Sequence, residues 1–381
     1  MERALRGASV VQSRGDSGII RARAAEGLEV RVLASSSAES ALVPGRLWAG
    51  LSPSTGSDFA EGVRVELQRS ELGRTGFAVT RLGFGAMELM GLAGPESAAD
   101  RDRLLGAVLD AGINLIDTAP DYGASEELLG QHLSHRRGEF FLASKCGCLV
   151  DREPALSGGK LEHDFRPANI RAGVEQTLRR VKTDWIDLVQ VHSSPSRSVL
   201  EEQDTIDAME TLRSEGKVRF LGMSSVEPQL SDHLAMDVFD VFQIPYSLLQ
   251  PEHGALISRA AAGGAGTIIR GGVARGAPAE DHDDATDHDF WRTFVRERRD
   301  LWERAALDEL LDGMSRMEFL LRFVLSHEDL HTTIVGTSKR EHLLANVEAA
   351  SRGPLPADIA REGARRVHEA TTARGAGAVG A

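Results

Sequence analysis

Short apolar segments alternate with amphipathic segments along this chain from residue 82 to residue 350. The apolar segments are continuous hydrophobic runs, which predict strands buried on both faces, as in a parallel sheet. The amphipathic segments have the 3.6-residue period of helices that cover a sheet. The predicted strands are residues 82–87, 114–118, 140–145, 187–192, 218–224, 241–246, 267–270 and 332–336. The predicted helices are residues 99–111, 126–133, 168–181, 201–215, 229–236, 254–262, 315–325 and 341–350.

This alternation predicts an α/β fold in which eight strands are each followed by a helix, that is, a (β/α)8 TIM barrel. The main alternative is a doubly wound sheet, which binds a dinucleotide on a G-x-G-x-x-G turn after its first strand. The first predicted strand contains Gly83 and Gly85, but the third glycine of that turn is absent. The sequence therefore favours the barrel.

Turn and helix signals predict the segments on either side of these strands. Residues 65–79 contain two short apolar runs around Leu72-Gly-Arg-Thr-Gly76, which indicate a β-hairpin. We expect this hairpin to close the bottom of the barrel. The expected domains are a barrel at residues 63–352 and a C-terminal segment at residues 353–381, with a helix at 358–371 and a flexible Gly/Ala-rich tail at 374–381.

Residues 1–62 are rich in Ala, Ser, Gly and Arg, with little periodicity beyond a short alternation at residues 28–33. We expect a low-complexity, disordered extension. A targeting peptide is one alternative, but an apolar core is absent, and Asp16, Glu26 and Glu39 do not suit a transit peptide. An over-extended start of the reading frame is another alternative.

Composition narrows the range of partners. The net charge of -13, with dispersed Lys and Arg, argues against nucleic acid. No apolar run approaches the roughly 20 residues that a membrane span needs. Cys146 and Cys148 are separated by one residue in a predicted strand and are badly placed to form a disulfide. We therefore expect a cytoplasmic protein, in a reducing compartment, that acts on a small molecule.

The longest predicted loop, residues 276–289, is rich in Asp and His. These residue types bind metals, but the loop lacks the glycine-punctuated ligand spacing of an ion-binding loop. We therefore predict a solvated loop and no metal site. A metal-dependent barrel hydrolase that uses this loop is an alternative function. Residues 291–311, beyond the loop, are predicted to be helical.

Ionisable side chains follow several predicted strands, at the end where the active residues of a (β/α)8 barrel gather. Asp117 ends the second strand, Lys145 the third and His192 the fourth, and Tyr122 lies on the loop after Asp117. A buried salt bridge for Lys145 and Asp117, and a core position for His192, are the alternative roles. A charge after an apolar run is costly without a partner. Four such groups at neighbouring strand ends favour a shared catalytic role.

These four groups suit proton transfer. A tyrosine has an ordinary pKa of about 10. An adjacent ammonium stabilises the phenolate, so we expect Lys145 to lower the pKa of Tyr122 while Asp117 keeps the lysine charged and in place. His192 then donates or orients a hydrogen bond toward the same oxygen. Such a phenol protonates the alkoxide that develops when a hydride adds to a carbonyl.

From about residue 65 to residue 350, the chain resembles the aldo-keto reductases, which are NAD(P)-dependent (β/α)8-barrel oxidoreductases. The resemblance implies that Asp117, Tyr122, Lys145 and His192 form the catalytic tetrad, with Tyr122 as the general acid. Separated segments carry the resemblance in the right order: LGRTG at 72–76, IDTAPDYG at 116–123, ASKC at 143–146, DWIDLVQVH at 184–192, GKVRFLGMSS at 216–225, QIPYSLL at 243–249, and VGTSK at 335–339 leading to Asn346.

The family binds its cofactor across the barrel mouth, so the resemblance also implies a set of cofactor-binding residues. Residues 224, 225 and 243 would hold the nicotinamide carboxamide, residues 271–275 the pyrophosphate, and residues 336–346 the adenosine end. Glycine amides and a helix N-terminus near residue 339 favour phosphate, although glycines also serve in ordinary turns. The predicted set is Ser224, Ser225, Gln243, Arg270, Gly271, Gly272, Val273, Arg275, Gly336, Thr337, Ser338, Lys339, His342 and Asn346.

The chain departs from the family at some of these positions. Ser225 stands where the family usually has Asn, and Arg270 stands where many members place an aromatic ring against the nicotinamide. Lys339 offers a point charge for a 2′-phosphate, so NADP(H) is the predicted cofactor and NAD(H) the alternative. We predict a reductase of aldehydes or ketones, or the reverse alcohol oxidation. A nicotinamide-binding redox sensor or accessory subunit with little turnover is the alternative function.

Overall fold

The computed structural model describes residues 66–92, 98–150, 162–279 and 289–378, together with two strands before residue 34. The chain divides into two compact units, Met1–Gly62 and Val63–Ala381. In the first unit, β1 (Ile19–Arg23) and β2 (Glu29–Leu33) form an antiparallel hairpin. β2 coincides with the alternation at residues 28–33. The rest of the predicted disordered extension lies outside the described residues.

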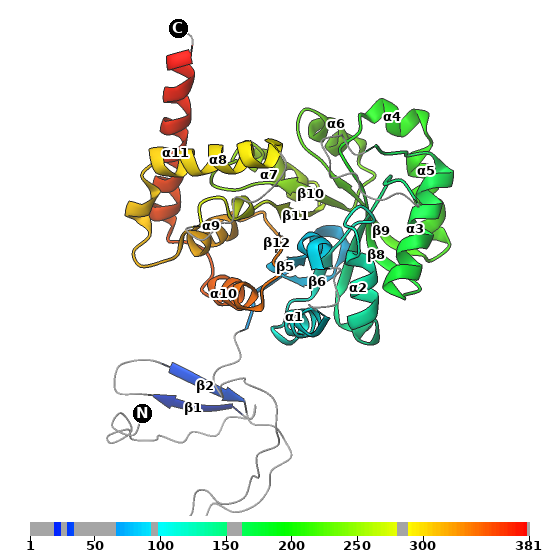
Figure 1. The fold of residues 1–381 in the computed structure, drawn as a ribbon, viewed down its shortest axis with the longest axis horizontal. Coiled ribbons are helices and arrows are strands. Elements are labelled where there is room, and N and C mark those ends of the chain that lie inside the picture. Colours follow the sequence, from blue (N-terminus) through cyan, green and yellow to red (C-terminus); the bar gives the residue numbers. More distant parts are fainter. Residues whose placement is uncertain are drawn as a thin grey trace, which may run out of the picture. The chain divides into compact units, whose positions relative to one another are not determined.

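The second unit contains a closed barrel of parallel strands with helices around it (Figure 1). The strand order is β10-β11-β12-β5-β6-β7-β8-β9, so successive strands are neighbours and β12 closes on β5. This order confirms the predicted (β/α)8 TIM barrel. The barrel strands are β5 (Leu82–Gly85), β6 (Leu115–Asp117), β7 (Phe141–Cys146), β8 (Ile186–Val191), β9 (Val218–Ser224), β10 (Val241–Pro245), β11 (Gly266–Arg270) and β12 (Thr332–Val335).

The barrel strands are buried on both faces, which explains their continuous apolar sequence. Every residue of β7 and of β8 is buried. One face fills the barrel interior with side chains such as Leu115, Phe141, Leu188, Val241 and Ile268. The other face packs in a larger core formed with the helices. The predicted strand ranges match the observed ones closely for this reason.

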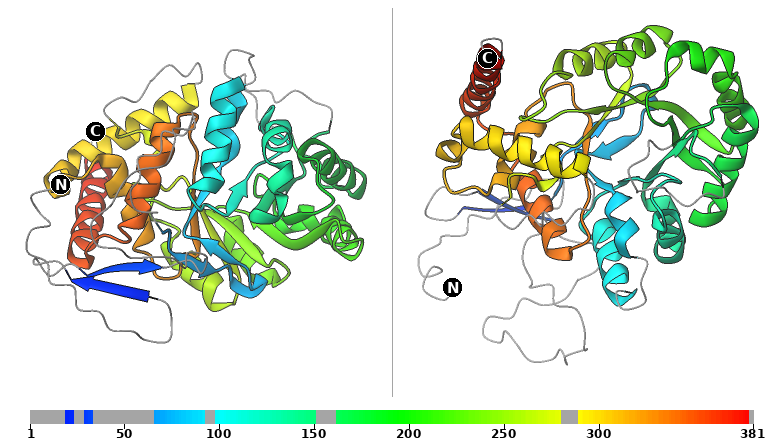
Figure 2. Two further views of the ribbon diagram at one scale, coloured as in Figure 1. Left: turned by 90° about the horizontal axis from the view of Figure 1, so that it is seen from below. Right: turned by 45° about the horizontal axis from the view of Figure 1, so that its top comes forward.

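Helices lie outside the barrel strands (Figure 2). No helix in the described ranges is long and apolar enough to cross a lipid bilayer. The helices are α1 (Ala98–Asp110), α2 (Ser125–His132), α3 (Pro167–Val181), α4 (Arg197–Glu202), α5 (Thr205–Ser214), α6 (Gln229–Met236), α7 (Gly254–Ala262), α8 (Asp289–Arg304), α9 (Arg316–Leu325), α10 (Arg340–Ser351) and α11 (Ala357–Ala378).

Three helix predictions were wrong in their boundaries. The predicted helix at 201–215 is two helices, α4 and α5, because Asp204 between them has a left-handed φ of 51°. The predicted helix at 291–311 ends at Arg304, and Ala306 beyond it has a φ of 46°. At the C-terminus, α11 continues to Ala378, past the predicted end at residue 371. Most of the predicted Asp/His-rich loop lies outside the described residues.

A hairpin closes the amino-terminal end of the barrel, as predicted. Strands β3 (Arg69–Glu71) and β4 (Ala78–Thr80) are joined through the 3-10 turn η1 (Gly73–Thr75). Leu72 and Val79 are fully buried in the barrel interior, together with Phe141. Gly73 has a φ of 50°, and a Cβ atom there would lie 2.2 Å from the backbone nitrogen of Gly266, so this contact requires glycine. The carboxyl end of the strands is therefore the end available to ligands.

The contact between α2 and α3 gives a test of the helix packing. A Cβ atom at Gly130 in α2 would lie 2.0 Å from the carbonyl oxygen of Arg180. A Cβ atom at Gly106 in α1 would have no described atom within 4 Å apart from its own helix backbone and chain neighbours. We expect Gly130→Ala to lower the free energy of unfolding by about 1–3 kcal/mol, because the backbone must shift. Gly106→Ala should raise it by about 0.5–1 kcal/mol, because alanine is the better helix former. Urea unfolding followed by circular dichroism measures both, and equal effects would contradict this packing.

Candidate active site

The four predicted catalytic side chains lie together at the carboxyl end of the barrel. Asp117 is the last residue of β6, Lys145 is the penultimate residue of β7, and His192 directly follows β8. The backbone N–H of Tyr122 donates to the carbonyl oxygen of Ala119, which turns the loop after β6. The Lys145 Nζ atom lies 6.0 Å from the centroid of the Tyr122 ring. The ring centroids of Tyr122 and His192 are 6.2 Å apart, in an edge-to-face arrangement.

Lys145 and Asp117 form a buried ion pair. Lys145 Nζ donates to Asp117 Oδ2 at 2.5 Å and to the carbonyl oxygen of Thr118 at 3.1 Å. The two side chains are 0% and 2% exposed. The side-chain amides of Gln190 and Gln243 donate to the same Oδ2 atom, at 3.0 and 2.8 Å. These hydrogen bonds offset part of the cost of removing two charges from water.

The pKa of Tyr122 shifts in the direction opposite to our prediction. Burial raises this pKa most, the negative charge of Asp117 raises it further, and Arg270 opposes both. Among the described residues, no hydrogen bond joins Lys145 to Tyr122, because the ammonium donates to Asp117 and Thr118 instead. The prediction that Lys145 lowers the pKa of Tyr122 was therefore wrong. The phenol keeps its proton at neutral pH, and a protonated phenol is what a general acid requires.

His192 also belongs to a cluster of side chains that the sequence analysis missed. Its Nδ1 atom lies 3.3 Å from Cys148 Sγ, 3.4 Å from His163 Nε2 and 3.5 Å from Asp121 Oδ2. Asp121 and His163 are not at strand ends, so the search for polar strand ends did not find them. The available signals were an aspartate beside Tyr122 and a cysteine close to Lys145.

The charges in this cluster influence each other. Burial by itself raises the pKa of Asp121, but interactions with His163, His192 and Cys148 outweigh burial and hold this pKa below its ordinary range. Burial lowers the pKa of His192, although Asp121 opposes the shift. Burial and the charge of Asp121 both raise the pKa of Cys148. Asp121 therefore carries a negative charge next to a neutral imidazole and a neutral thiol. Both cysteines, Cys146 and Cys148, are free and buried.

Two predicted cofactor residues belong to the hydrogen-bond network of the buried ion pair. Ser224, the last residue of β9, donates from Oγ to Gln243 Oε1 at 3.3 Å, and Gln243 donates to Asp117. Ser225 is different, because its fully buried hydroxyl lies 2.8 Å from His233 Nδ1. The structure therefore brings Ser224 and Gln243, but not the Ser225 side chain, into the network around Asp117.

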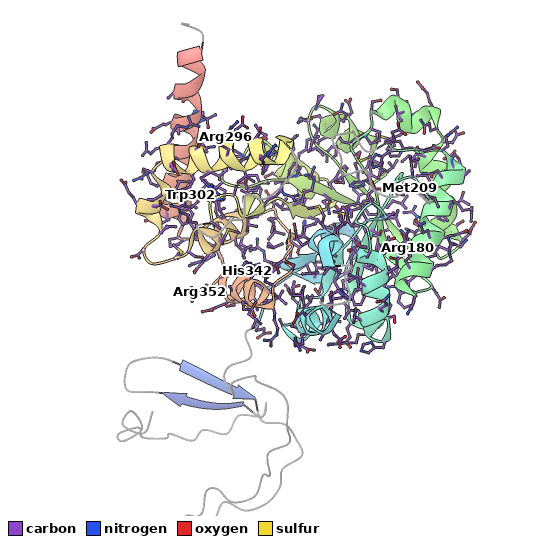
Figure 3. All side chains as sticks on the ribbon, viewed as in Figure 1. Arg180, Met209, Arg296, Trp302, His342 and Arg352 are labelled. Atoms are coloured by element: carbon purple, nitrogen blue, oxygen red, sulfur yellow. The ribbon has the colours of Figure 1, made fainter. Side chains whose placement is uncertain are left out.

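The other predicted cofactor residues follow β11 and β12. Arg270 ends β11, and in the described part of the chain its guanidinium forms no hydrogen bond or ion pair. Next to it, Gly271 has a φ of 70° and open space around its Cβ position. The residues that follow, on the turn with η5 (Ala274–Gly276), are Gly272, Val273 and Arg275. Between β12 and α10 lie Gly336, Thr337, Ser338 and Lys339. His342, which Figure 3 labels, and Asn346 lie in α10.

Residues 81–362 match the Aldo/keto reductase family. The chain belongs to this family. Its members are oxidoreductases that use nicotinamide cofactors, so the family match confirms the resemblance seen in the sequence. This chain is 27% identical to YqkF, an uncharacterized oxidoreductase of Bacillus subtilis (strain 168), and the alignment covers 75% of this chain and 92% of YqkF. The NADH-specific methylglyoxal reductase of Escherichia coli (strain K12) is 32% identical over 48% of this chain and 60% of its own length.

Solved structures of aldo-keto reductases have the same fold. The holo form of an aldo-keto reductase from Bacillus halodurans has a TM-score of 0.65 and 27% identity, over 79% of this chain and 96% of the other. The glycerol dehydrogenase from Gluconobacter oxydans has a TM-score of 0.62 and 25% identity, over 80% of this chain and 95% of the other. These similarities extend over nearly the full length of both neighbours.

The buried ion pair gives a stability test of the aldo-keto reductase site. Asp117→Asn keeps the side-chain size but leaves the Lys145 ammonium buried without a negative partner, so we expect a loss of about 3–5 kcal/mol. Adding Lys145→Met removes the orphaned charge, so the double variant should recover much of that loss. Urea unfolding of the parent and both variants measures the effect. A double variant less stable than Asp117→Asn alone would contradict the coupling between the two charges.

Proposed function

We propose that this chain transfers a hydride between a nicotinamide cofactor and the carbonyl of an aldehyde or ketone, or catalyses the reverse oxidation of an alcohol. The observation that carries the proposal is the Tyr122 phenol beside the buried Lys145–Asp117 pair and the His192 imidazole. Membership of an oxidoreductase family supports it. Tyr122 acts as the general acid or base in this proposal.

Each of the four side chains has a distinct role. When bound, reduced nicotinamide supplies the hydride. Tyr122 donates its proton to the carbonyl oxygen as negative charge develops there, and a phenolate remains. Asp117 holds the Lys145 ammonium in place, 6.0 Å from the ring centroid. The positive charge of Arg270 opposes the rise in the pKa of Tyr122 and therefore favours this phenolate. His192 orients the carbonyl oxygen through a hydrogen bond. In alcohol oxidation the phenolate takes the proton back.

The residues at the barrel mouth fit an anionic dinucleotide. Arg270 provides a positive charge that the described part of the chain leaves without an ion-pair partner. The open space beside Gly271 lets a ligand approach the backbone closely. Ser224 and Gln243 would hold the carboxamide, residues 271–275 would lie along the pyrophosphate, and residues 336–346 would hold the adenosine end.

Substitution of Tyr122 tests the proposal directly. We expect Tyr122→Phe to lower carbonyl reduction by at least about 100-fold, the lower end of what a positioned acid contributes, while nicotinamide binding persists. The chain has one other tyrosine, Tyr246, which packs against Phe323 of α9, so Tyr246→Phe is the matched control and should stay active. Oxidation of NADPH or NADH with methylglyoxal and other aldehydes, and the reverse reaction with glycerol, measure activity by absorbance.

The outcome for Tyr122→Phe separates the alternatives. A variant as active as the parent would contradict the role of Tyr122. Tight nicotinamide binding by the parent without turnover of any carbonyl would favour a redox sensor or accessory subunit instead. Activity that needs no nicotinamide and disappears with a chelator would favour a metal-dependent hydrolase.

Cofactor preference gives a second test, because NADP(H) and NAD(H) differ by one phosphate. We propose that NADP(H) is preferred and that exposed Lys339, directly before α10, contacts the 2′-phosphate. Lys339→Gln should raise the KM for NADPH about 5- to 20-fold and change that for NADH by less than about 2-fold, because only NADPH carries that phosphate. Lys182→Gln, at the exposed end of α3, is the control. Equal changes for the two cofactors would contradict a phosphate contact at Lys339.

A further inference from the structure

A compact cluster of metal-ligand atoms lies next to Tyr122. We propose that Asp121, Cys148, His163 and His192 bind one zinc ion, which positions His192 for the proposed reaction. Each residue offers one donor atom, and the four atoms all lie within 4.8 Å of one another. The consequence for catalysis rests on the proposed function, since His192 belongs to both sites. Zinc binding itself does not depend on turnover.

The distances in the cluster fit a tetrahedral zinc site. Zinc binds nitrogen and oxygen at about 2.0–2.2 Å and thiolate sulfur at about 2.3 Å, so neighbouring ligands in a tetrahedron are about 3.3–3.6 Å apart. His192 Nδ1 lies 3.3 Å from Cys148 Sγ, 3.4 Å from His163 Nε2 and 3.5 Å from Asp121 Oδ2. His163 Nε2 lies 3.4 Å from Asp121 Oδ2. Four of the six separations match the edges of such a tetrahedron, and the two from Cys148 Sγ to His163 and Asp121 are at most 4.8 Å, so the Cys148 side chain would move closer as an ion binds.

Hydrogen bonding alone does not account for this arrangement. The buried Oδ2 atom of Asp121 has no hydrogen-bond partner in the described ranges, although two imidazole nitrogens lie 3.4 and 3.5 Å away. A buried carboxylate oxygen without a hydrogen-bond partner is costly. His163 Nε2 also lies 3.0 Å from Ser193 Oγ, so zinc would replace that contact. A cation at the centre would satisfy all four donor atoms.

The donor types favour zinc over other common cations. Ca²⁺ and Mg²⁺ select oxygen ligands, whereas one thiolate, two imidazoles and one carboxylate are the ligands of Zn²⁺. The thiolate of Cys148 and the carboxylate of Asp121 together balance the two positive charges of the ion. Cys148 loses its thiol proton to solvent as the zinc–sulfur bond forms. The side chains of Asp121, His163 and His192 are only 12%, 5% and 16% exposed, and Cys148 is buried, so water competes weakly.

Backbone contacts hold the ligands in place. Cys148 and His163 pair through an isolated antiparallel β-bridge, and the Asn169 side chain donates to the carbonyl oxygen of Cys148 at 3.0 Å. Gly147 has a φ of 91°, and a Cβ atom there would lie 2.3 Å from the Phe165 ring, so this position requires glycine. The Phe165 ring stacks on His163, with centroids 5.9 Å apart. These contacts supply the outer support that ordered metal sites require.

Zinc at this position would fix the protonation state of the His192 imidazole. Ligation through Nδ1 requires the neutral imidazole, so the proton is on Nε2 and that nitrogen becomes a hydrogen-bond donor. Four protein ligands leave no open coordination position, which is the pattern of a structural rather than a catalytic zinc. The ion therefore acts through His192 and through Asp121, the neighbour of Tyr122, and does not contact the carbonyl.

A binding titration tests the site without an activity assay. The full chain, without a polyhistidine tag and dialysed against a chelator, is titrated with Zn²⁺ in competition with a chromophoric chelator. We expect about one tight zinc ion per chain, since the cluster offers the four ligands of one closed site. Co²⁺ in its place should produce a sulfur-to-cobalt charge-transfer band, because Cys148 is a ligand. No tight zinc binding by the parent chain would overturn the proposal.

Matched variants localise the ion. Cys148→Ser and His163→Asn should each weaken zinc binding by more than the about 10–100-fold that loss of an outer-shell partner costs. Cys146→Ala, two residues from Cys148, should leave it unchanged, as should His282→Asn combined with His288→Asn in the Asp/His-rich loop. Circular dichroism identifies a variant that does not fold, and Asp121→Asn then replaces it. Zinc binding of parental strength in folded Cys148→Ser and His163→Asn would overturn the proposal.

Activity separates this proposal from the proposed function. Tight zinc binding without carbonyl reduction supports the metal site and contradicts the enzyme. Carbonyl reduction by a chain that binds no zinc supports the enzyme and contradicts the metal site. If the chain both binds zinc and reduces carbonyls, removal of zinc should lower kcat more than it raises the KM for the nicotinamide cofactor, because His192 acts on the carbonyl and not on the cofactor.

Discussion

A lysine ammonium buried in a protein needs a fixed negative partner, and the carboxyl end of this barrel is arranged around that need. Asp117 Oδ2 accepts hydrogen bonds from Lys145 on β7, Gln190 on β8 and Gln243 on β10. Ser224 on β9 extends the network through Gln243. One carboxylate therefore connects five of the barrel strands, β6 to β10, so the geometry of the candidate site and the arrangement of these strand ends depend on the same contacts.

Much of the fold was predictable because its strands obey one strong rule. Barrel strands covered on both faces must be apolar throughout, and each predicted strand overlaps an observed one. The interruptions at Asp204 and Ala306 were not predictable in the same way. Both residues adopt a left-handed conformation without being glycine, which is the residue that usually marks this conformation in a sequence.

The candidate site was predictable in position but not in all its chemistry. Asp117, Lys145 and His192 were found because parallel strands in a barrel end at one mouth. The direction of the Tyr122 pKa shift was not predictable, because it depends on how deeply the phenol is buried and how close Asp117 lies. The approach of His163 to His192 depends on a bridge to Cys148, which no periodicity in the sequence indicates. Local patterns identified the groups, and packing determined their electrostatic state.

The β3–β4 hairpin covers one end of the barrel with Leu72 and Val79, and packed side chains fill the interior, so the carboxyl end of the described strands is the entrance that reactants share. Two reactants that share one entrance cannot exchange independently, because the molecule seated deeper must arrive first and depart last. A dinucleotide lying across the strand ends beneath a carbonyl compound would be the deeper one. If the proposed function holds, such an arrangement favours a compulsory-order kinetic scheme, in which the alcohol product is released before the spent coenzyme.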